Sequence, residues 1–201
     1  MLKKIAFIGL MCMAFLVNAE NGYDTLAPAQ PVQNPDKIEV IEFFWYGCPH
    51  CYHLEPSVAA WLKTKPANVE FIRQPAIFSE LWGKHAKAFF TAEALGVQEK
   101  VHADFFDAIQ NKHQKLETEE ELLKFFTEHG VKAEDFRNAY HSFAVDAKMR
   151  QAESLAPRYG ITGVPALVVN GKYRVTGQTA KSQENMFTVT NQLIQQESQV
   201  K

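Results

Sequence analysis

The sequence predicts an α/β protein in which a mixed central sheet is interrupted by an all-helical insertion. Residues 37–46 are a run of β-branched and aromatic residues, followed by a helical segment and a second short strand in the order of a β-α-β unit. Residues 79–159 show helical patterns only. The chain then returns to strands around an Asn170-Gly171 turn, so both halves of the chain are expected to contribute to one sheet.

The amino terminus, residues 1–19, has the pattern of a cleavable secretory signal. Lys3 and Lys4 form a short basic start, residues 5–17 are apolar, and a small-residue exit ends at Ala19. The apolar run is shorter than the roughly 20 residues that a membrane-spanning helix needs. No later stretch is long and apolar enough to act as an anchor. The chain is therefore expected to be exported, cleaved near Ala19 and free of a membrane anchor.

The composition narrows the classes of function. Of the 201 residues 46% are hydrophobic and 22% are charged, and the formal net charge is -2, so neither disorder nor nucleic-acid binding is expected. One of the three cysteines, Cys12, lies within the signal. A lipoprotein would use Cys12 as its lipidated residue, but the residues before it fit that pattern poorly. Cys48 and Cys51 are then the only cysteines of the mature chain, in a compartment where cysteines usually become structural cross-links.

The first helix is expected to begin at these two cysteines. The strand at 37–46 leads to Cys48, the expected N-cap, and Pro49 suits the first helical position of a helix over 50–64. A second strand is expected at 68–73, parallel to the first and joined to it by a right-handed crossover. The cysteines therefore lie at the carboxyl end of the first strand, the edge at which function collects in open α/β sheets.

The rest of the chain divides into an insertion and a return to the sheet. We expect the helical insertion to span 79–159 and the sheet-containing domain to comprise 20–78 and 160–201. A capping box begins at Thr118 and ends at Glu121. Paired phenylalanines are predicted to form the core of the insertion: Phe89, Phe90, Phe105, Phe106, Phe125 and Phe126.

The carboxyl-terminal part is predicted to contain a hairpin and one helix. Residues 166–169 form an apolar strand, Asn170-Gly171 is a strong two-residue turn, and residues 173–175 return antiparallel. The final helix is expected over 182–197.

Cys48 and Cys51 are spaced for reversible disulfide chemistry. One helical turn places their side chains on the same face, about 5 to 6 Å apart at Cβ. At the N-cap, Cys48 meets unsatisfied N–H groups and the positive end of the helix dipole, which favour a thiolate, and a protonated His50 adds to this effect. A stabilised thiolate leaves readily, so the oxidised pair is expected to be a strong oxidant with Cys51 as the shielded, resolving thiol. Val164-Pro165, just before the third strand, is a candidate for a cis bond at the same sheet edge.

Together these segments resemble a known family. They cover essentially the whole chain after residue 19 and are, in order, Glu42-Phe43-Phe44, Cys48-Pro49-His50-Cys51-Tyr52, the helical insertion, Gly163-Val164-Pro165-Ala166 and Val169-Asn170-Gly171-Lys172-Tyr173. They look like the periplasmic DsbA family of thiol-disulfide oxidoreductases. The resemblance implies a thioredoxin fold with an inserted helical domain, and no cofactor other than a redox-active disulfide between Cys48 and Cys51.

The resemblance also implies a role for each motif residue. Cys48 is the exposed nucleophile and Cys51 resolves the mixed disulfide. A cis-proline at Pro165 holds extended substrate backbone through the residue before it, Val164. Glu42 corresponds to a buried acid that serves proton transfer during exchange.

The same resemblance implies the partners and the compartment. The protein would donate its disulfide to reduced, newly exported proteins and peptides in the periplasm, where Pro49 and His50 complete the catalytic motif. A quinone-linked membrane oxidase of the DsbB type would restore the disulfide, and the protein would act as a monomer. Trp45-Tyr46-Gly47 and Pro56 differ from the best-known members, which affects the expected shape of the substrate surface and leaves the chemistry intact.

Several alternatives stay open at this point. The two cysteines could form a static structural disulfide, although so small a loop stabilises little, or join His53 in an incomplete zinc site. Glu42 could lie at a solvated edge or pair with a lysine. Five histidines show no spacing that suggests a site and are predicted to be surface or packing residues: His85, His102, His113, His129 and His141.

Two other functions also remain. A disulfide reductase or isomerase would use the same motif, but the 18 residues from Glu20 to Lys37 leave no room for the separate dimerisation domain of dimeric isomerases. A peptide-binding chaperone would hold unfolded chains in an apolar groove, with the cysteines incidental.

Overall fold

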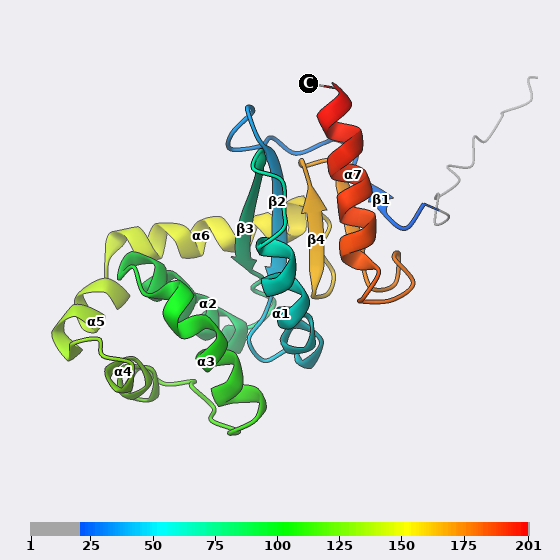
Figure 1. The fold of residues 1–201 in the computed structure, drawn as a ribbon. Coiled ribbons are helices and arrows are strands. Elements are labelled where there is room, and N and C mark those ends of the chain that lie inside the picture. Colours follow the sequence, from blue (N-terminus) through cyan, green and yellow to red (C-terminus); the bar gives the residue numbers. More distant parts are fainter. Residues whose placement is uncertain (1–20, 201) are drawn as a thin grey trace, which may run out of the picture.

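The computed structural model describes residues 21–200 and has the mixed sheet that the sequence predicts (Figure 1). Within these residues the sheet has five strands in the order β1-β5-β4-β2-β3. Strands β2 and β3 are parallel, and the other neighbouring pairs are antiparallel. The strands are β1 (Asp24–Thr25), β2 (Ile38–Phe44), β3 (Val69–Pro75), β4 (Ala166–Val169) and β5 (Tyr173–Thr176).

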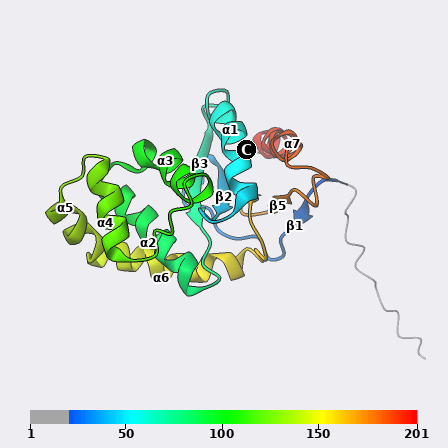
Figure 2. The ribbon, with the colours of Figure 1, turned by 90° about the horizontal axis from the view of Figure 1, so that it is seen from below.

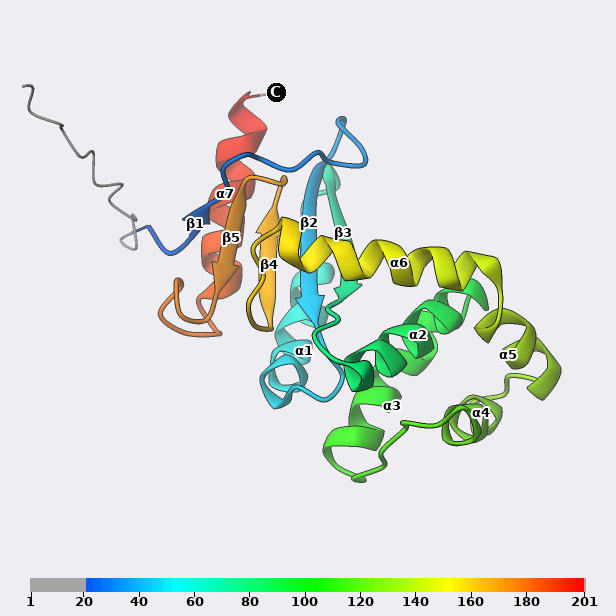
Figure 3. The same cartoon turned by 180° about the vertical axis from the view of Figure 1, so that it is seen from behind.

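The helices cover both faces of the sheet and extend past one of its edges. Helices α1 and α7 lie on one face, and the carboxyl end of α6 crosses the other (Figures 2 and 3). Helices α2 to α5 and the amino end of α6 form the predicted helical insertion beyond β3. The helices are α1 (Pro49–Leu62), α2 (Glu80–Ala94), α3 (Gln98–Gln110), α4 (Glu119–Glu128), α5 (Ala133–Tyr140), α6 (Phe143–Arg158) and α7 (Met186–Val200).

Most predicted elements have ends that are shifted by one to three residues, and two larger details differ from the sequence-based prediction. The short strand β1 was not predicted, because two residues are too few for an alternating pattern to show. Helix α7 begins at Met186 rather than at residue 182, because residues 182–185 form a turn in which the Asn185 N–H donates to Ser182 Oγ. The predicted hairpin turn is present, with φ of 50° at Asn170 and 66° at Gly171.

The side chains of β2 alternate between the two faces of the sheet. Val40 packs in one cluster with Leu54 of α1 and Leu193 of α7. Phe43 packs in another cluster with Tyr159, on the side covered by α6. Glu42 has the same parity as Val40, so it lies beneath α1, the helix that carries Cys51.

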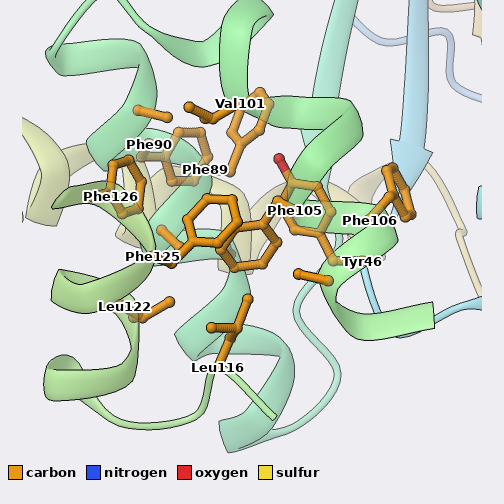
Figure 4. Packing of buried hydrophobic residues seen from close by; sticks show 14 of the residues in the cluster. Tyr46, Phe89, Phe90, Val101, Phe105, Phe106, Leu116, Leu122, Phe125 and Phe126 are labelled. Atoms are coloured by element: carbon orange, nitrogen blue, oxygen red, sulfur yellow. The ribbon is translucent and has the colours of Figure 1, made fainter. Parts of the chain in front are cut away.

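The insertion has its own aromatic core, as predicted. All six phenylalanines named from the sequence are buried. Figure 4 shows Phe105 against Phe125, with Tyr46 of the active-site loop packed beside Phe105. The predicted capping box of α4 is also present. Because Tyr46 belongs to the same cluster, the loop that precedes the cysteines is part of the core of the insertion.

The amino-terminal prediction lies outside the described residues, since the signal was expected at residues 1–19. Among residues 21–200, no helix combines the length and the apolar character needed to cross a membrane.

Candidate active site

Cys48 is the N-cap of α1, as the sequence predicts. Its backbone is extended, with φ -90° and ψ 114°, and Pro49 occupies the first helical turn. The Cys51 N–H, which has no partner within the helix at this position, donates to Cys48 Sγ at 3.3 Å. Both cysteines are free thiols in this structure. The reduced pair is therefore held so that Cys48 receives hydrogen bonds from the start of the helix.

The pKa values of the two thiols are shifted in opposite directions. The pKa of Cys48 is lowered to about 6, and the largest cause is a hydrogen bond from the Cys51 side chain. Burial acts in the other direction and raises the pKa. The backbone N–H groups of Cys51 and His50, and the charge of His50, lower it further. Burial, followed by the hydrogen bond to Cys48, raises the pKa of Cys51 above its ordinary value. Cys48 is 8% exposed and Cys51 is 0% exposed. Cys48, which the resemblance implies to be exposed, is buried in this structure, but it is the more accessible sulfur of the two, and Cys51 is the shielded thiol.

The residue before Pro165 lies directly against Cys48. The Val164-Pro165 bond is cis, and Cys48 Sγ lies 3.4 Å from the Val164 carbonyl oxygen, to which it donates only when it is protonated. A cavity of about 850 Å³ opens at this point, with His50, Val164, Pro165 and Lys181 among its lining residues. The predicted nucleophile and the predicted substrate-binding residues therefore meet at the edge of one cavity.

Glu42 is fully buried, so the alternative of a solvated edge is wrong. In the parallel ladder it is the register partner of Arg73, and Arg73 Nε lies 3.7 Å from its Oε2. That distance is too long for a hydrogen bond, and both carboxyl oxygens lack a hydrogen-bond partner among the described residues. Burial, then the charge of Glu55, raises the pKa of Glu42 to about 8 against the effect of Arg73. Glu42 is therefore a protonated acid at neutral pH beneath the helix that carries Cys51.

The loop between β2 and Cys48 is attached to the helical insertion. The Trp45 indole N–H donates to His85 Nδ1 at 3.0 Å. The Tyr46 hydroxyl is 2.8 Å from His102 Nδ1, and the Gln110 amide donates to the Tyr46 carbonyl oxygen at 2.7 Å. Three residues from two helices of the insertion thus position the two residues that precede Gly47-Cys48.

Gly47 has a steric role in the same loop. The Trp45 ring folds over it, so a Cβ at this position would collide with the indole. The indole in turn stacks on Trp82, with ring centroids 4.3 Å apart and 10° between the planes. Residues 45–47 are therefore one packing unit that joins the loop before Cys48 to α2.

Sequence reasoning did not find the hydrogen bonds of two histidines. His85 and His102 are packing residues, one of the two alternatives predicted for them, at 2% and 4% exposed, and they are also hydrogen-bonded to the loop before Cys48. No local pattern reveals this, because their partners lie 40 and 56 residues away in sequence. The sequence could have indicated Arg73 as a partner of Glu42, because it is a charged residue in the strand that pairs with the strand of Glu42.

The zinc alternative has no support in the geometry. His53 is exposed whereas Cys51 is fully buried. Among residues 21–200, no three histidine, cysteine, aspartate or glutamate side chains come together as a metal site.

Comparisons with known proteins agree with this geometry. The family model of the DSBA-like thioredoxin domain matches residues 39–189. The thiol:disulfide interchange protein DsbA of Pseudomonas aeruginosa PAO1 is 42% identical over 197 residues, 98% of this chain and 93% of that protein. The protein of the same name from Azotobacter vinelandii is 49% identical over 175 residues, 87% of this chain and 82% of that protein.

Solved structures give the same result. The crystal structure of Pseudomonas aeruginosa DsbA superposes with a TM-score of 0.85 at 44% identity, over 89% of this chain and 93% of that one. The structure of the oxidoreductase DsbA from Xylella fastidiosa superposes with a TM-score of 0.82 at 31% identity, over 88% of this chain and 95% of that one. With its paired cysteines at the start of α1 and its helical insertion, the chain belongs to the DsbA family of thiol-disulfide oxidoreductases.

Proposed function

We propose that the protein oxidises newly exported proteins by donating the disulfide of Cys48 and Cys51 to them. The observation that carries this proposal is the unequal acidity of the two cysteines. A thiolate with a pKa of about 6 is a good leaving group, and its stability favours the reduced state of the protein. The oxidised protein is therefore poised to accept electrons from substrate thiols.

The exchange proceeds in two steps. A substrate thiolate attacks Cys48 Sγ, a substrate-Cys48 disulfide forms, and the bond to Cys51 breaks with its electron pair left on Cys51 Sγ. Cys51 then takes a proton, for which Glu42 is the buried donor. The second substrate thiolate attacks the substrate sulfur of the mixed disulfide, and Cys48 leaves as a thiolate. The substrate loses two electrons and gains a disulfide, and the protein becomes a thiolate-thiol pair.

The cavity beside Cys48 is the proposed place for the substrate chain. The Val164 backbone adjoins both Cys48 and this cavity. An extended peptide that pairs with the Val164 backbone brings its own cysteine to Cys48 Sγ. Pairing through backbone atoms accepts many sequences, which suits an oxidant with many clients.

The setting of this activity follows from the sequence. Residues 1–19 are proposed to direct export to the periplasm and to be removed near Ala19. The sheet-containing domain, residues 20–78 and 160–201, carries the cysteines, and residues 79–159 form the inserted helical domain. A quinone-linked membrane oxidase of the DsbB type is proposed to reoxidise the pair, and the protein is proposed to work as a monomer.

Trapping of clients tests the proposal. In Cys51→Ala, expressed in the exported compartment, the Cys48 thiolate can still attack a client disulfide and expel one client thiolate. No Cys51 thiol is left to resolve the mixed disulfide, so clients stay attached to Cys48. We expect non-reducing gels and mass analysis to find mixed disulfides with many exported proteins. The matched control is the Cys48→Ala, Cys51→Ala double variant, which offers no thiol and traps nothing. An absence of mixed disulfides on Cys51→Ala would sink the proposal.

The chaperone alternative makes a different prediction for Cys48→Ala. An oxidant loses all oxidation of a dithiol peptide in this variant, while binding of an unfolded peptide is retained. If Cys48→Ala oxidises the peptide as fast as the parent protein, the disulfide is not the reagent.

A further inference from the structure

The buried side of the active site contains a chain of polar side chains that starts in the loop before Cys48. The Tyr46 hydroxyl is 2.8 Å from His102 Nδ1, and His102 Nε2 is 3.3 Å from Glu55 Oε1. Arg73 Nη2 donates to Glu55 Oε2 at 3.2 Å, and Arg73 Nε lies 3.7 Å from Glu42. The chain thus connects a histidine of the helical insertion to the acid beneath Cys51.

The chemistry of the partners fixes the direction of the hydrogen bonds. Burial lowers the pKa of His102, so its imidazole is neutral and carries one N–H. A carboxylate such as Glu55 only accepts, so the proton of His102 is on Nε2 and donates to Glu55. Nδ1 is then the acceptor for the Tyr46 O–H. The Glu55 carboxylate therefore receives hydrogen bonds from His102 on one oxygen and from Arg73 on the other.

The two carboxyl groups interact unequally with one partly buried cation, Arg73. Glu55 is hydrogen-bonded to Arg73 and His102, whereas Glu42 has no hydrogen-bond partner among the described residues. Burial would raise the pKa of Glu55, but the hydrogen bond from His102, together with the charge and the hydrogen bond of Arg73, lowers the pKa overall. The third acidic neighbour of Arg73 is Glu99 at 3.6 Å, and its side chain is 84% exposed. Either Glu42 or Glu55 can carry the proton, and the charge state of each changes the pKa of the other.

We propose that His102 is a positioning residue of the oxidoreductase that decides which of these carboxyls carries the proton. By donating to Glu55 it holds Arg73 on that carboxylate and leaves the proton on Glu42, beneath Cys51. The charged and titratable groups that face His102 are Tyr46, Glu55, Arg73 and Glu99. Those that act on Glu42 are Glu55 and Arg73, and Glu42 in turn acts on Cys51.

The consequence for exchange rests on the proposed function. When the disulfide opens, the electron pair goes to Cys51 Sγ, and the Glu42 proton moves to that sulfur, leaving a carboxylate beside Arg73. In the reduced protein Glu42, with its pKa of about 8, then takes up a proton from solvent, and on reoxidation it releases this proton before it accepts the proton of Cys51. If the proton rested on Glu55, which is 16% exposed in its side chain and faces Arg73 and His102, the thiolate of Cys51 would lack its donor.

The parent protein allows a first test without any substitution. Carbon-13 shifts of the glutamate carboxyls report which one is protonated, and nitrogen-15 shifts of the imidazole report the tautomer of His102. At pH 7 we expect a protonated Glu42, an ionised Glu55 and a proton on His102 Nε2. A proton on His102 Nδ1, an imidazolium, or a protonated Glu55 overturns the proposal. These readouts use no substrate, so they are separate from the test of client oxidation.

A matched pair of variants isolates the hydrogen bond to Glu55. The amide of His102→Gln lies near the position of Nε2 and keeps a donor to Glu55. The shorter amide of His102→Asn lies near the position of Nδ1 and keeps an acceptor for Tyr46 while losing that donor. We expect the ratio of protonated Glu42 to protonated Glu55 to fall about tenfold in His102→Asn, equal to about 1.4 kcal/mol, and to recover in His102→Gln.

Tyr46→Phe separates this effect from a loosened active-site loop. It removes the other hydrogen bond of His102 but leaves the donor to Glu55, so Glu42 stays protonated. An unchanged ratio in His102→Asn, or the same fall in Tyr46→Phe as in His102→Asn, contradicts the role of His102. Exchange with a small thiol supplies the kinetic readout, and we expect it to slow in His102→Asn and to recover in His102→Gln.

Discussion

The outer and inner sides of the cysteine pair differ in almost every physical respect. On the outer side, Cys48 adjoins an open cavity and the Val164 backbone. On the inner side, Cys51 is fully buried and lies above Glu42, whose nearest cation is Arg73. The outer side presents the Val164 backbone and the Cys48 thiolate to the substrate. The inner side holds the acid that exchanges a proton with Cys51.

Because of this difference, the reactivity of Cys48 and the protonation of the groups around Cys51 depend on different parts of the fold. The start of α1 lowers the pKa of Cys48 through groups that belong to the helix itself. The acidity of the inner side depends on residues from β2, β3, α1 and α3, which are brought together only by the complete fold. Changes on the inner side are therefore expected to alter stability and its pH dependence, and changes on the outer side to alter encounters with substrate.

Glu42→Gln is expected to have the largest effect on the inner side. The folded-state pKa of about 8 exceeds the ordinary 4.5, so Glu42 contributes stability that is complete below about pH 4.5 and lost as the pH rises through 8. The amide does not titrate, so the difference in unfolding free energy between variant and parent should change by about 3 to 5 kcal/mol across this range. Denaturant unfolding of the oxidised proteins, in which Cys48 does not titrate, measures it. A difference independent of pH would show that the pKa of Glu42 is not raised in the folded protein.

Gly47→Ala tests the packing that joins the two sides. The added Cβ collides with the Trp45 indole, which is stacked on Trp82 and hydrogen-bonded to His85. We expect a loss of about 1 to 3 kcal/mol from overpacking, measured by thermal and denaturant unfolding. Gly163→Ala is the control, because its Cβ would meet no atom within 4 Å. Equal losses in the two variants would mean that the indole moves aside freely.

Replacement of Cys51 measures how far the inner thiol sets the acidity of the outer one. Cys51→Ala removes the side-chain donor that contributes most to the low pKa of Cys48. We expect the pKa of Cys48 to rise by about one unit, as followed by thiolate absorbance during a pH titration. Cys51→Ser keeps a hydroxyl donor and should show a smaller rise. The same pKa in all three proteins would assign the stabilisation to the helix start alone.

The smallest expected effects come from two glutamines, one on each side, whose removal compares the stability that a single hydrogen bond contributes on each side. The Gln183 amide donates to the His50 carbonyl oxygen at 2.8 Å at an exposed position, and the Gln110 amide donates to the Tyr46 carbonyl oxygen at 2.7 Å at a partly buried one. We expect about 0.5 kcal/mol of lost stability for Gln183→Ala and about 1 to 2 kcal/mol for Gln110→Ala. Chemical denaturation of both variants checks the order. A larger loss for Gln183→Ala would reverse the comparison.

The sequence predicts the outer side of the site well because its parts are adjacent in the chain. Cys48, Pro49 and Cys51 follow a strand directly, and helix geometry alone makes Cys48 the N-cap. The mixed sheet also follows from local patterns, since a β-α-β unit and a two-residue hairpin each dictate the direction of their strands.

The inner side is much less predictable because its residues meet only through tertiary packing. His102 is 47 residues from Glu55 and 56 from Tyr46 in the chain, and nothing near it marks it as a hydrogen-bonding residue. The sequence indicates only one contact of the inner side, because Glu42 and Arg73 are opposite charges on two strands that are expected to pair. The exposed fractions of the two side chains, 0% for Glu42 and 9% for Arg73, depend on tertiary packing that no local pattern shows.

The unequal acidity of Cys48 and Cys51 is the central claim, and the pH dependence of alkylation tests it most directly. The reduced protein is treated with iodoacetamide across a range of pH, and mass analysis identifies the modified cysteine. We expect Cys48 to react with a midpoint near pH 6 and Cys51 to stay unmodified in the folded protein. A midpoint near 9, or equal modification of the two cysteines, would contradict the account.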